Sequence, residues 1–327
     1  MDVSNISQGT APTGQMKPAP LGRAVSAVVN NPSGNFAVTN PVSKNLTITK
    51  EDARARYAGD LLVSTAGPTT TAATVRLSAT ITDIAATLEA GTDTSAGDVR
   101  NATVTFVNRD TGAAISPAIP VTLPNSSETS IGEAVFNWAV DLGANTAQTF
   151  RVGMRVDNYY TRDNTAEDAL VTVSRGITTG FATGGGYLTM SGSGGLKPGD
   201  AGTFNTFGYG VTYTGAGSSP AGYFNAMTRS GGAVYSIKGT TFTSVVVNGK
   251  TATLRGTASI YTVTTGSTLL DGAATFEVTI NDLGEPGSSD QIGIQVKNGA
   301  GAVWFSSDWT GAVTLNALLT GGNLKMP

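Results

Sequence analysis

Histidine and cysteine are both absent from the 327 residues of this chain. Without them it cannot form a Ser-His-Asp triad, a cysteine nucleophile, the usual zinc sites or an iron–sulfur cluster. Disulfide bonds are excluded too, so each folded part must be stabilised by its own core or by bound ions. What remains is hydrolysis by paired carboxylates, a Ser-Lys arrangement, or binding of hard cations through oxygen atoms.

Charged residues are scarce as well. They make up 13% of the chain, with a net charge of −3 and a pI near 5.0, whereas soluble proteins carry roughly 25%. Such a chain has no basic surface large enough to hold a phosphate backbone, so we expect no nucleic-acid partner. No segment approaches the roughly 18 consecutive apolar residues of a membrane helix, so we expect no membrane span.

Glycine, by contrast, is abundant, with 42 residues, and threonine, serine, alanine and valine are frequent. This mixture suits strands joined by tight turns, because β-branched side chains pack well on a sheet and glycine adopts positive φ at corners. The segment "TVRLSATITDI" places Val75, Leu77, Ala79 and Ile81 on one face of a strand. We therefore predict an all-β fold of antiparallel sheets.

The spacing of the predicted strands divides the chain into three parts. Residues 1–35 are rich in proline, glycine, serine and asparagine, and we expect a linker or disordered leader there. Residues 36–175 contain about seven short strands, which predicts an Ig-like β-sandwich. Residues 176–327 predict a second antiparallel β-sandwich module, and we expect the glycine run Gly184–Gly186 to be the hinge between the two modules.

The second half resembles a C-terminal module of secreted and cell-surface bacterial proteins. The likeness lies in "FATGGGYLTM" (Phe181 to Met190), "DLGEPGSSDQIGIQV" (Asp282 to Val296) and "VWFSSDW" (Val303 to Trp309). The first half, with "LTITKEDARARYAGD" and "DNYYTRDNTAEDALVTV", resembles the bacterial Ig-like or cadherin-like repeat that precedes such modules. The resemblance implies an extracellular or cell-surface location in a bacterium and a structural or adhesive role without catalysis.

Two acidic loops are the candidate metal sites, because carboxylate oxygens are the ligands that calcium prefers. The candidate ligands are Asp157, Asp163, Glu167 and Asp168 in the first loop, and Asp282, Glu285 and Asp290 in the second. A bound Ca²⁺ in the first loop would stiffen the junction between the modules. The alternative is that both loops are hairpin turns whose acidic side chains stay solvated, with Pro286-Gly287 at the centre of a type II turn.

Two other functions stay open. Tyrosines and tryptophans such as Tyr187 and Trp309 can stack on sugars, which would make the chain a carbohydrate-binding module, although most of these rings are expected in the core. Paired carboxylates, for instance Glu277 with Asp282 or Asp308 with Glu285, can hydrolyse a glycoside. Expected partners are other modules of the same surface protein, surface glycans, or copies of the chain that associate through sheet edges.

Overall fold

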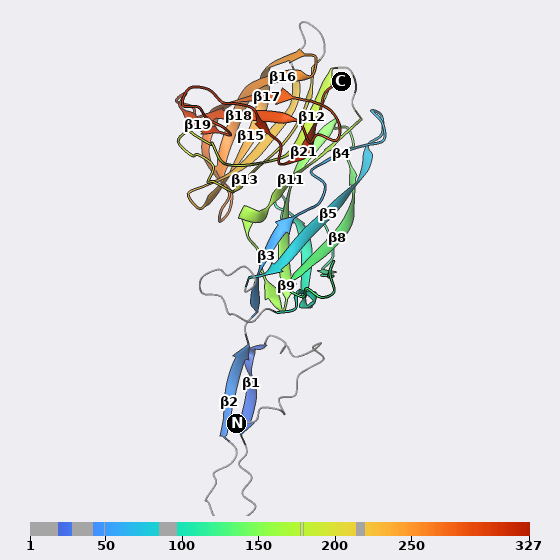
Figure 1. The fold of residues 1–327 in the computed structure, drawn as a ribbon, viewed down its shortest axis with the longest axis vertical. Coiled ribbons are helices and arrows are strands. Elements are labelled where there is room, and N and C mark those ends of the chain that lie inside the picture. The colour runs from blue at the N-terminus through green and yellow to red at the C-terminus, as the bar shows by residue number, and fades with distance from the viewer. Residues whose placement is uncertain are drawn as a thin grey trace, which may run out of the picture.

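The computed structural model describes residues 19–27, 42–48, 50–84, 97–176, 178, 180–213 and 220–327. Strands joined by turns build all of this region, and it contains no α-helix, only the 3₁₀ turns η2 (Val99–Asn101) and η3 (Thr165–Glu167) (Figure 1). The predicted all-β fold is confirmed. In the same region, no helix has the length and apolar character needed to cross a membrane.

Residues 51–174 form two sheets packed face to face, which we call the sandwich (Figure 1). The first sheet contains, in spatial order, β10 (Tyr160–Thr161), β3 (Glu51–Tyr57), β5 (Ala72–Asp83) and β8 (Ile131–Asp141). The second contains, in spatial order, β4 (Leu62–Ser64), β11 (Ala169–Ser174), β9 (Ala147–Asn158), β6 (Ala102–Asn108) and β7 (Ile119–Pro120). The pairs β10/β3 and β11/β4 are parallel, and the others are antiparallel.

The core of the sandwich follows the alternation seen in the sequence. Val75, Leu77, Ala79 and Ile81 of β5 are all fully buried, as predicted, and face the inner residues of the second sheet. Trp138 and Phe150 meet edge to face at 4.8 Å across this core. Full burial of one such aliphatic side chain contributes about 1.5–3 kcal/mol, so this cluster stabilises the sandwich without disulfides.

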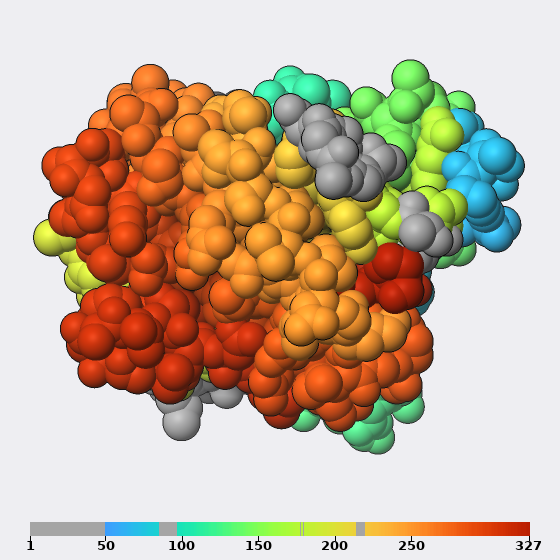
Figure 2. All heavy atoms as spheres, turned by 90° about the horizontal axis from the view of Figure 1, so that it is seen from above, coloured from blue at the N-terminus to red at the C-terminus, as the bar shows by residue number. Residues whose placement is uncertain are grey.

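The second folded part, residues 181–325, is a single ten-stranded antiparallel sheet, which we call the curled sheet. Its first eight strands pair in chain order: β12 (Phe181–Thr189), β13 (Phe204–Thr212), β14 (Ala221–Ser230), β15 (Ala233–Asn248), β16 (Thr251–Thr262), β17 (Thr268–Asn281), β18 (Gln291–Lys297) and β19 (Val303–Ser306). Two short strands complete the sheet: β20 (Ala317–Leu318) pairs with β18, which is next to the end strand β19, and β21 (Gly321–Lys325) pairs with β12 at the opposite end. Figure 2 shows the molecule from above the view of Figure 1, and the surface seen there belongs mainly to the orange and red strands β15 to β19.

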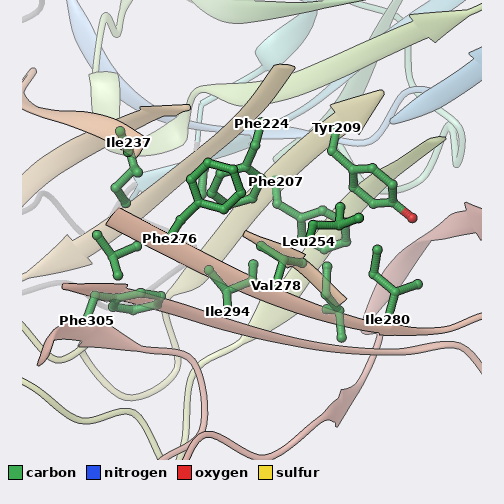
Figure 3. Close-up of a cluster of buried hydrophobic side chains, with 14 of the residues drawn as sticks. Phe207, Tyr209, Phe224, Ile237, Leu254, Phe276, Val278, Ile280, Ile294 and Phe305 are labelled. Atoms are coloured by element: carbon green, nitrogen blue, oxygen red, sulfur yellow. The ribbon is translucent and has the colours of Figure 1, made fainter. Parts of the chain in front are cut away.

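Curling lets one face of this long sheet form its own core. Phe207, Phe224, Leu254, Phe276 and Ile294 come from five different strands and point toward one another (Figure 3). The rings of Phe224 and Phe276 lie 4.8 Å apart, within the range of favourable aromatic pairs. A single sheet can therefore bury a large apolar surface without a separate second layer.

The N-terminal region contains a strand where the sequence predicts a linker. Strand β1 (Ala19–Ala27) lies inside the segment that the sequence predicts to be a linker, and it pairs with β2 (Val42–Ile48) in a sheet of their own. The rest of residues 1–35 lies outside the described residues. Because β2 pairs with β1, the described strands of the sandwich begin at Glu51 rather than near residue 36.

The prediction that Gly184–Gly186 forms a hinge is wrong. These glycines lie inside β12, where they are buried and paired with β13 on one side and β21 on the other. A Cβ on Gly185 would lie 2.6 Å from the carbonyl oxygen of Leu61 in the sandwich. The glycines are therefore needed for close packing, and the sequence pattern could not show this because Leu61, which makes the shortest contact with Gly185, belongs to a distant segment of the chain.

Candidate functional site

The sandwich and the curled sheet meet across a buried contact surface, which we call the joint. Strand β11 lies at its centre, and all six of its residues are buried. Val171 and Val173 point into the sandwich core, whereas Leu170 packs against Met227, Val234 and Val263 of the curled sheet. A strand covered on both faces reads as a nearly continuous apolar run, and "ALVTV" has this pattern.

Glycines let the two sheets approach closely at the joint. Gly185 and Gly208 are cross-strand partners in β12 and β13. A Cβ on Gly208 would lie 2.2 Å from Oγ1 of Thr172 and 2.7 Å from Oγ1 of Thr149. The two threonine hydroxyls lie 2.9 Å apart and satisfy each other by hydrogen bonding. Backbone of the curled sheet thus rests directly on threonine side chains of the sandwich.

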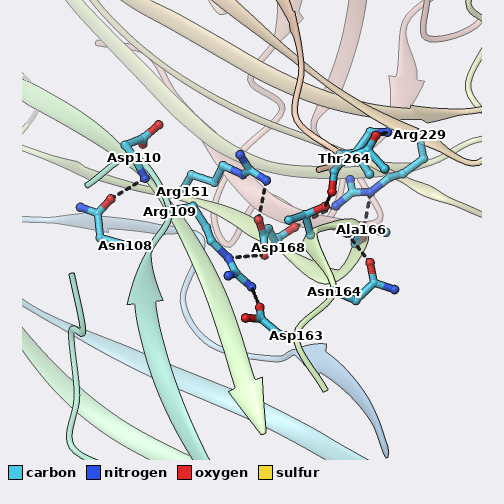
Figure 4. A network of polar contacts seen from close by, with 12 residues as sticks. Asn108, Arg109, Asp110, Arg151, Asp163, Asn164, Ala166, Asp168, Arg229 and Thr264 are labelled. Atoms are coloured by element: carbon cyan, nitrogen blue, oxygen red, sulfur yellow. Dashed lines mark hydrogen bonds and ion pairs between the residues drawn. The ribbon is translucent and has the colours of Figure 1, made fainter. Parts of the chain in front are cut away.

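A buried ionic cluster continues the joint around Asp168. Its carboxylate accepts a hydrogen bond from Nε of Arg109 at 3.1 Å and lies 2.7 Å from Nη2 of Arg151 (Figure 4). The side chain of Arg109 crosses β9 at Gly153, where any Cβ would collide with the guanidinium group. Arg109, in the turn that follows β6, and Arg151, in β9, therefore hold one carboxylate that has no exposed side-chain surface.

Arg229 links this cluster to the curled sheet. From β14, its guanidinium group donates to the carbonyl oxygens of Ala166 at 3.0 Å and Asp168 at 2.9 Å (Figure 4), and also to that of Phe204. Burial lowers the pKa of Arg229 to about 10, so the side chain remains charged at neutral pH. Charge-assisted hydrogen bonds of this kind are among the strong ones in proteins, and here two of the three cross the joint.

Burial also changes the ionisation of Asp168. Loss of solvent raises the pKa of its carboxyl group to about 6, although Arg151 and Arg109 both favour the charged form. Burial likewise raises the pKa of the neighbouring Glu167, whose carboxylate is bound by Arg162. Glu167 and Asp168 thus belong to a buried ion-pair network, whereas the side chains of Asp157 and Asp163 in the same loop stay exposed.

The four predicted ligands of the first loop each have a cationic partner, and Arg109 is shared by Asp163 and Asp168. Asp157 binds Lys50, Asp163 lies 2.6 Å from Arg109, Glu167 binds Arg162, and Asp168 binds two arginines. The side-chain interaction with Lys50 lowers the pKa of Asp157. No group of three or more acidic residues suited to a metal ion occurs in the part of the chain that the structure describes. Calcium binding here stays a prediction.

The second loop is a hairpin between β17 and β18, as the alternative interpretation of the sequence holds. Its carboxylates are not all solvated, however, because Asp282 and Asp290 are buried. Asp290 accepts the backbone N–H groups of Leu283 and Leu324, each at 2.8 Å, and Asp282 accepts that of Met326 at 2.9 Å. These two carboxylates fasten the C-terminal strand β21 to the rest of the sheet.

Glu285 differs from its two neighbours in this loop. It is exposed and accepts a hydrogen bond from Nδ2 of Asn323 at 2.6 Å. The N–H of Gly287 donates to the carbonyl oxygen of Gly284, so Pro286 takes the third position of this turn. The expected type II turn centred on Pro286-Gly287 is therefore wrong, since that turn would need Pro286 in second position.

Glu277 and Asp282, one of the two carboxylate pairs considered for hydrolysis, both have other partners. Glu277 accepts a hydrogen bond from Nε of Arg255 at 2.6 Å, and Asp282 is bound by the backbone of the last strand. Both carboxylates therefore act as hydrogen-bond acceptors that link strands of the curled sheet. The hydrolase alternative gains no support from them.

Beside the joint lies a groove of about 740 Å³, which we call the joint groove. One wall comes from β3 and the turn η3 of the sandwich, and the other from β12, β13 and β21 of the curled sheet. Tyr187 and Phe204 pack with ring centres 4.9 Å apart and planes inclined at 57°. The guanidinium carbon of Arg56 lies 4.9 Å from the centre of the Phe204 ring. Of the other aromatic candidates, Tyr209 and Trp304 are core residues.

Sequence reasoning missed the residues that matter most here: Arg109, Arg151, Arg229, Arg56 and Phe204. One signal was present, because Arg151 alternates with Phe150 and Val152 in a strand whose outward face also carries Ala147, Thr149 and Gly153. Small residues on the face opposite the core indicate that another layer covers it. Which layer covers it depends on contacts between distant segments, and these leave no local pattern.

Comparison with known proteins adds no relative to this description. No family model, no curated protein and no solved structure matches the chain.

Proposed function

We propose that the chain is a non-catalytic structural or adhesion element of an exported bacterial surface protein, in which the sandwich and the curled sheet act as one stiff unit. The observation that supports it is the buried joint, where glycine backbone rests on Thr149 and Thr172 and Arg229 binds carbonyl oxygens of the sandwich. A stalk or display element needs such a joint, because a flexible one would not hold a binding surface at a fixed distance. The surface location rests on the resemblance of both halves to modules of exported bacterial proteins.

The strand order of the sandwich fits a part that bears load. Strand β4 comes early in the sequence of the sandwich and β11 is its last strand, yet the two lie side by side. They pair in parallel through Leu62 with Thr172, Val63 with Val173 and Ser64 with Ser174. A pull that moves these strands past each other loads all of their hydrogen bonds at once rather than one after another. The rate of such forced unfolding is set by the unfolding barrier, which parallel loading keeps high.

Pulling single molecules from both ends in optical tweezers tests this proposal. We expect the joint and the sandwich to resist force, so that the curled sheet does not separate as a freely tethered body before any unfolding step. Separation of the two parts at negligible force would contradict it. Antibodies against the chain should also label intact cells of the bacterium that produces it, and labelling only after cell lysis would contradict the surface location.

A further inference from the structure

The joint groove contains a cation that has no anionic partner in the part of the chain that the structure describes. Arg56 is exposed, and within the described residues its side chain makes no ion pair or hydrogen bond, only the contact with the Phe204 ring. The other two arginines of the lining are engaged, because Arg229 donates to backbone carbonyl oxygens and Arg54 interacts with Glu167, which together with Asp168 supplies the carboxylates of the groove. Both carboxylates are already held by other arginines. The exposed mouth of the groove therefore has positive charge to offer to a ligand.

A second polar group in the groove also lacks a partner. Thr206 is 5% exposed, and its hydroxyl has no hydrogen-bond partner among the described residues. It lies directly across from Tyr187 in the pairing of β12 with β13. A buried hydroxyl left unpaired costs free energy, so a group that binds it gains affinity. Together with Arg56, it places a donor and a cation next to the aromatic pair.

These groups define the chemistry of the occupant. An arginine fork suits a carboxylate, and aromatic faces suit a surface of C–H groups. A buried hydroxyl suits a ligand hydroxyl, and a sugar acid presents all three features on one ring. A densely charged polyanion fits less well, because the chain has a net charge of −3. The size and position of the groove also agree, since ligand sites of roughly 300–1,000 Å³ occur preferentially between domains.

We propose that the joint groove binds acidic oligosaccharides, with Arg56 pairing a uronate carboxylate, Tyr187 and Phe204 contacting the sugar face, and Thr206 bonding a ring hydroxyl. The inference depends on the carbohydrate-binding alternative raised by the sequence and is independent of the load-bearing role. A stiff joint without glycan binding would leave the structural proposal intact. Glycan binding would add a recognition site at the place where the two parts meet.

Calorimetric titration of the full chain tests this, with short oligomers of galacturonic acid as ligand and galactose oligomers of the same length as the neutral control. We expect the acidic oligomers to bind about tenfold more tightly than the neutral ones, since a charge-assisted pair contributes about that factor. The affinity should fall as salt is added. Equal affinity for both oligomers, or no binding of the acidic ones, would overturn the proposal.

Two variants locate the site. Arg56→Gln should weaken binding of the acidic oligomers about tenfold, whereas Arg155→Gln, which removes the same charge from an exposed strand position outside the groove, should leave it unchanged. Thr206→Val should weaken binding without lowering the melting temperature, because the hydroxyl it removes has no partner to lose. Equal losses in both arginine variants, or unchanged binding in Arg56→Gln, would show that the glycan binds elsewhere.

Discussion

At the residue scale, single side chains decide whether the joint closes. The sequence shows a glycine run and several arginines. It does not show that Gly185 lies against the carbonyl oxygen of Leu61, or that Asp168 forms ion pairs with two arginines. Local patterns report which face of a strand is apolar. They do not report which distant strand covers that face, so the joint residues are visible only in the folded chain.

Gly185→Ala should destabilise the joint. The added Cβ meets a backbone carbonyl at 2.6 Å, and backbone cannot move aside as a side chain can. Overpacking of this kind typically costs about 1–3 kcal/mol, which chemical denaturation will measure. The control is Gly272→Ala, where the nearest atom lies at 3.8 Å. Equal effects of the two substitutions would mean that Gly185 has no special role in packing.

Asp168 should give the stability a particular dependence on pH. Its pKa is raised from 3.8 to about 6, so between these values the native state holds a proton that the unfolded state has released. This contribution is fully present below about pH 4 and is lost as the pH rises through about 6, by at most about 3 kcal/mol. The difference in unfolding free energy between the wild type and Asp168→Asn should therefore decrease over this interval. A difference that stays constant or increases would contradict the raised pKa.

At the element scale, the strands themselves follow from the sequence. The alternation in β5 predicts a strand that the structure contains, because the strand buries one face in a local core. The glycine-rich strand β12 could not be predicted, since Gly184, Gly185 and Gly186 supply no side chains to alternate. It is a strand because β13 and β21 pair with it on both sides.

Strand β21 should depend on the acidic hairpin. Asp290→Ala leaves the N–H groups of Leu283 and Leu324 without their acceptor, at a cost of about 1–3 kcal/mol for each group that stays buried. Hydrogen exchange should then become faster at Leu324 and Met326 while the amides of β5 keep their protection. Ser289→Ala, an exposed position in the same loop, is the control. Unchanged exchange at Leu324 would show that pairing with β12 alone holds the strand.

At the scale of the whole molecule, ion binding by the acidic loops and stiffness of the joint are two separate properties. A thermal melt after treatment with EDTA, with and without added calcium, tests the metal hypothesis for both acidic loops. Because lysine, arginine and backbone N–H groups already contact these carboxylates, we expect the melting temperature to stay the same with calcium or magnesium. A calcium-specific rise of several degrees would show a native ion site, as mass action requires.

Strand spacing predicts a division of the chain into parts, but it does not predict how those parts pack. The sequence suggests a hinge, whereas the structure has Gly185 and Gly208 buried against the sandwich and Arg229 bound to its backbone. Close packing of this kind couples the orientations of both parts. The central claim is thus that the sandwich and the curled sheet form one stiff body.

Residual dipolar couplings of backbone amides, measured in a weakly aligning medium, test that claim most directly. Couplings from β5, β6 and β9 report the orientation of the sandwich, and those from β14 to β18 report that of the curled sheet. If the joint is rigid, one alignment tensor will fit both sets in the arrangement described here. Two tensors of different magnitude would show that the parts reorient independently, and would contradict the account.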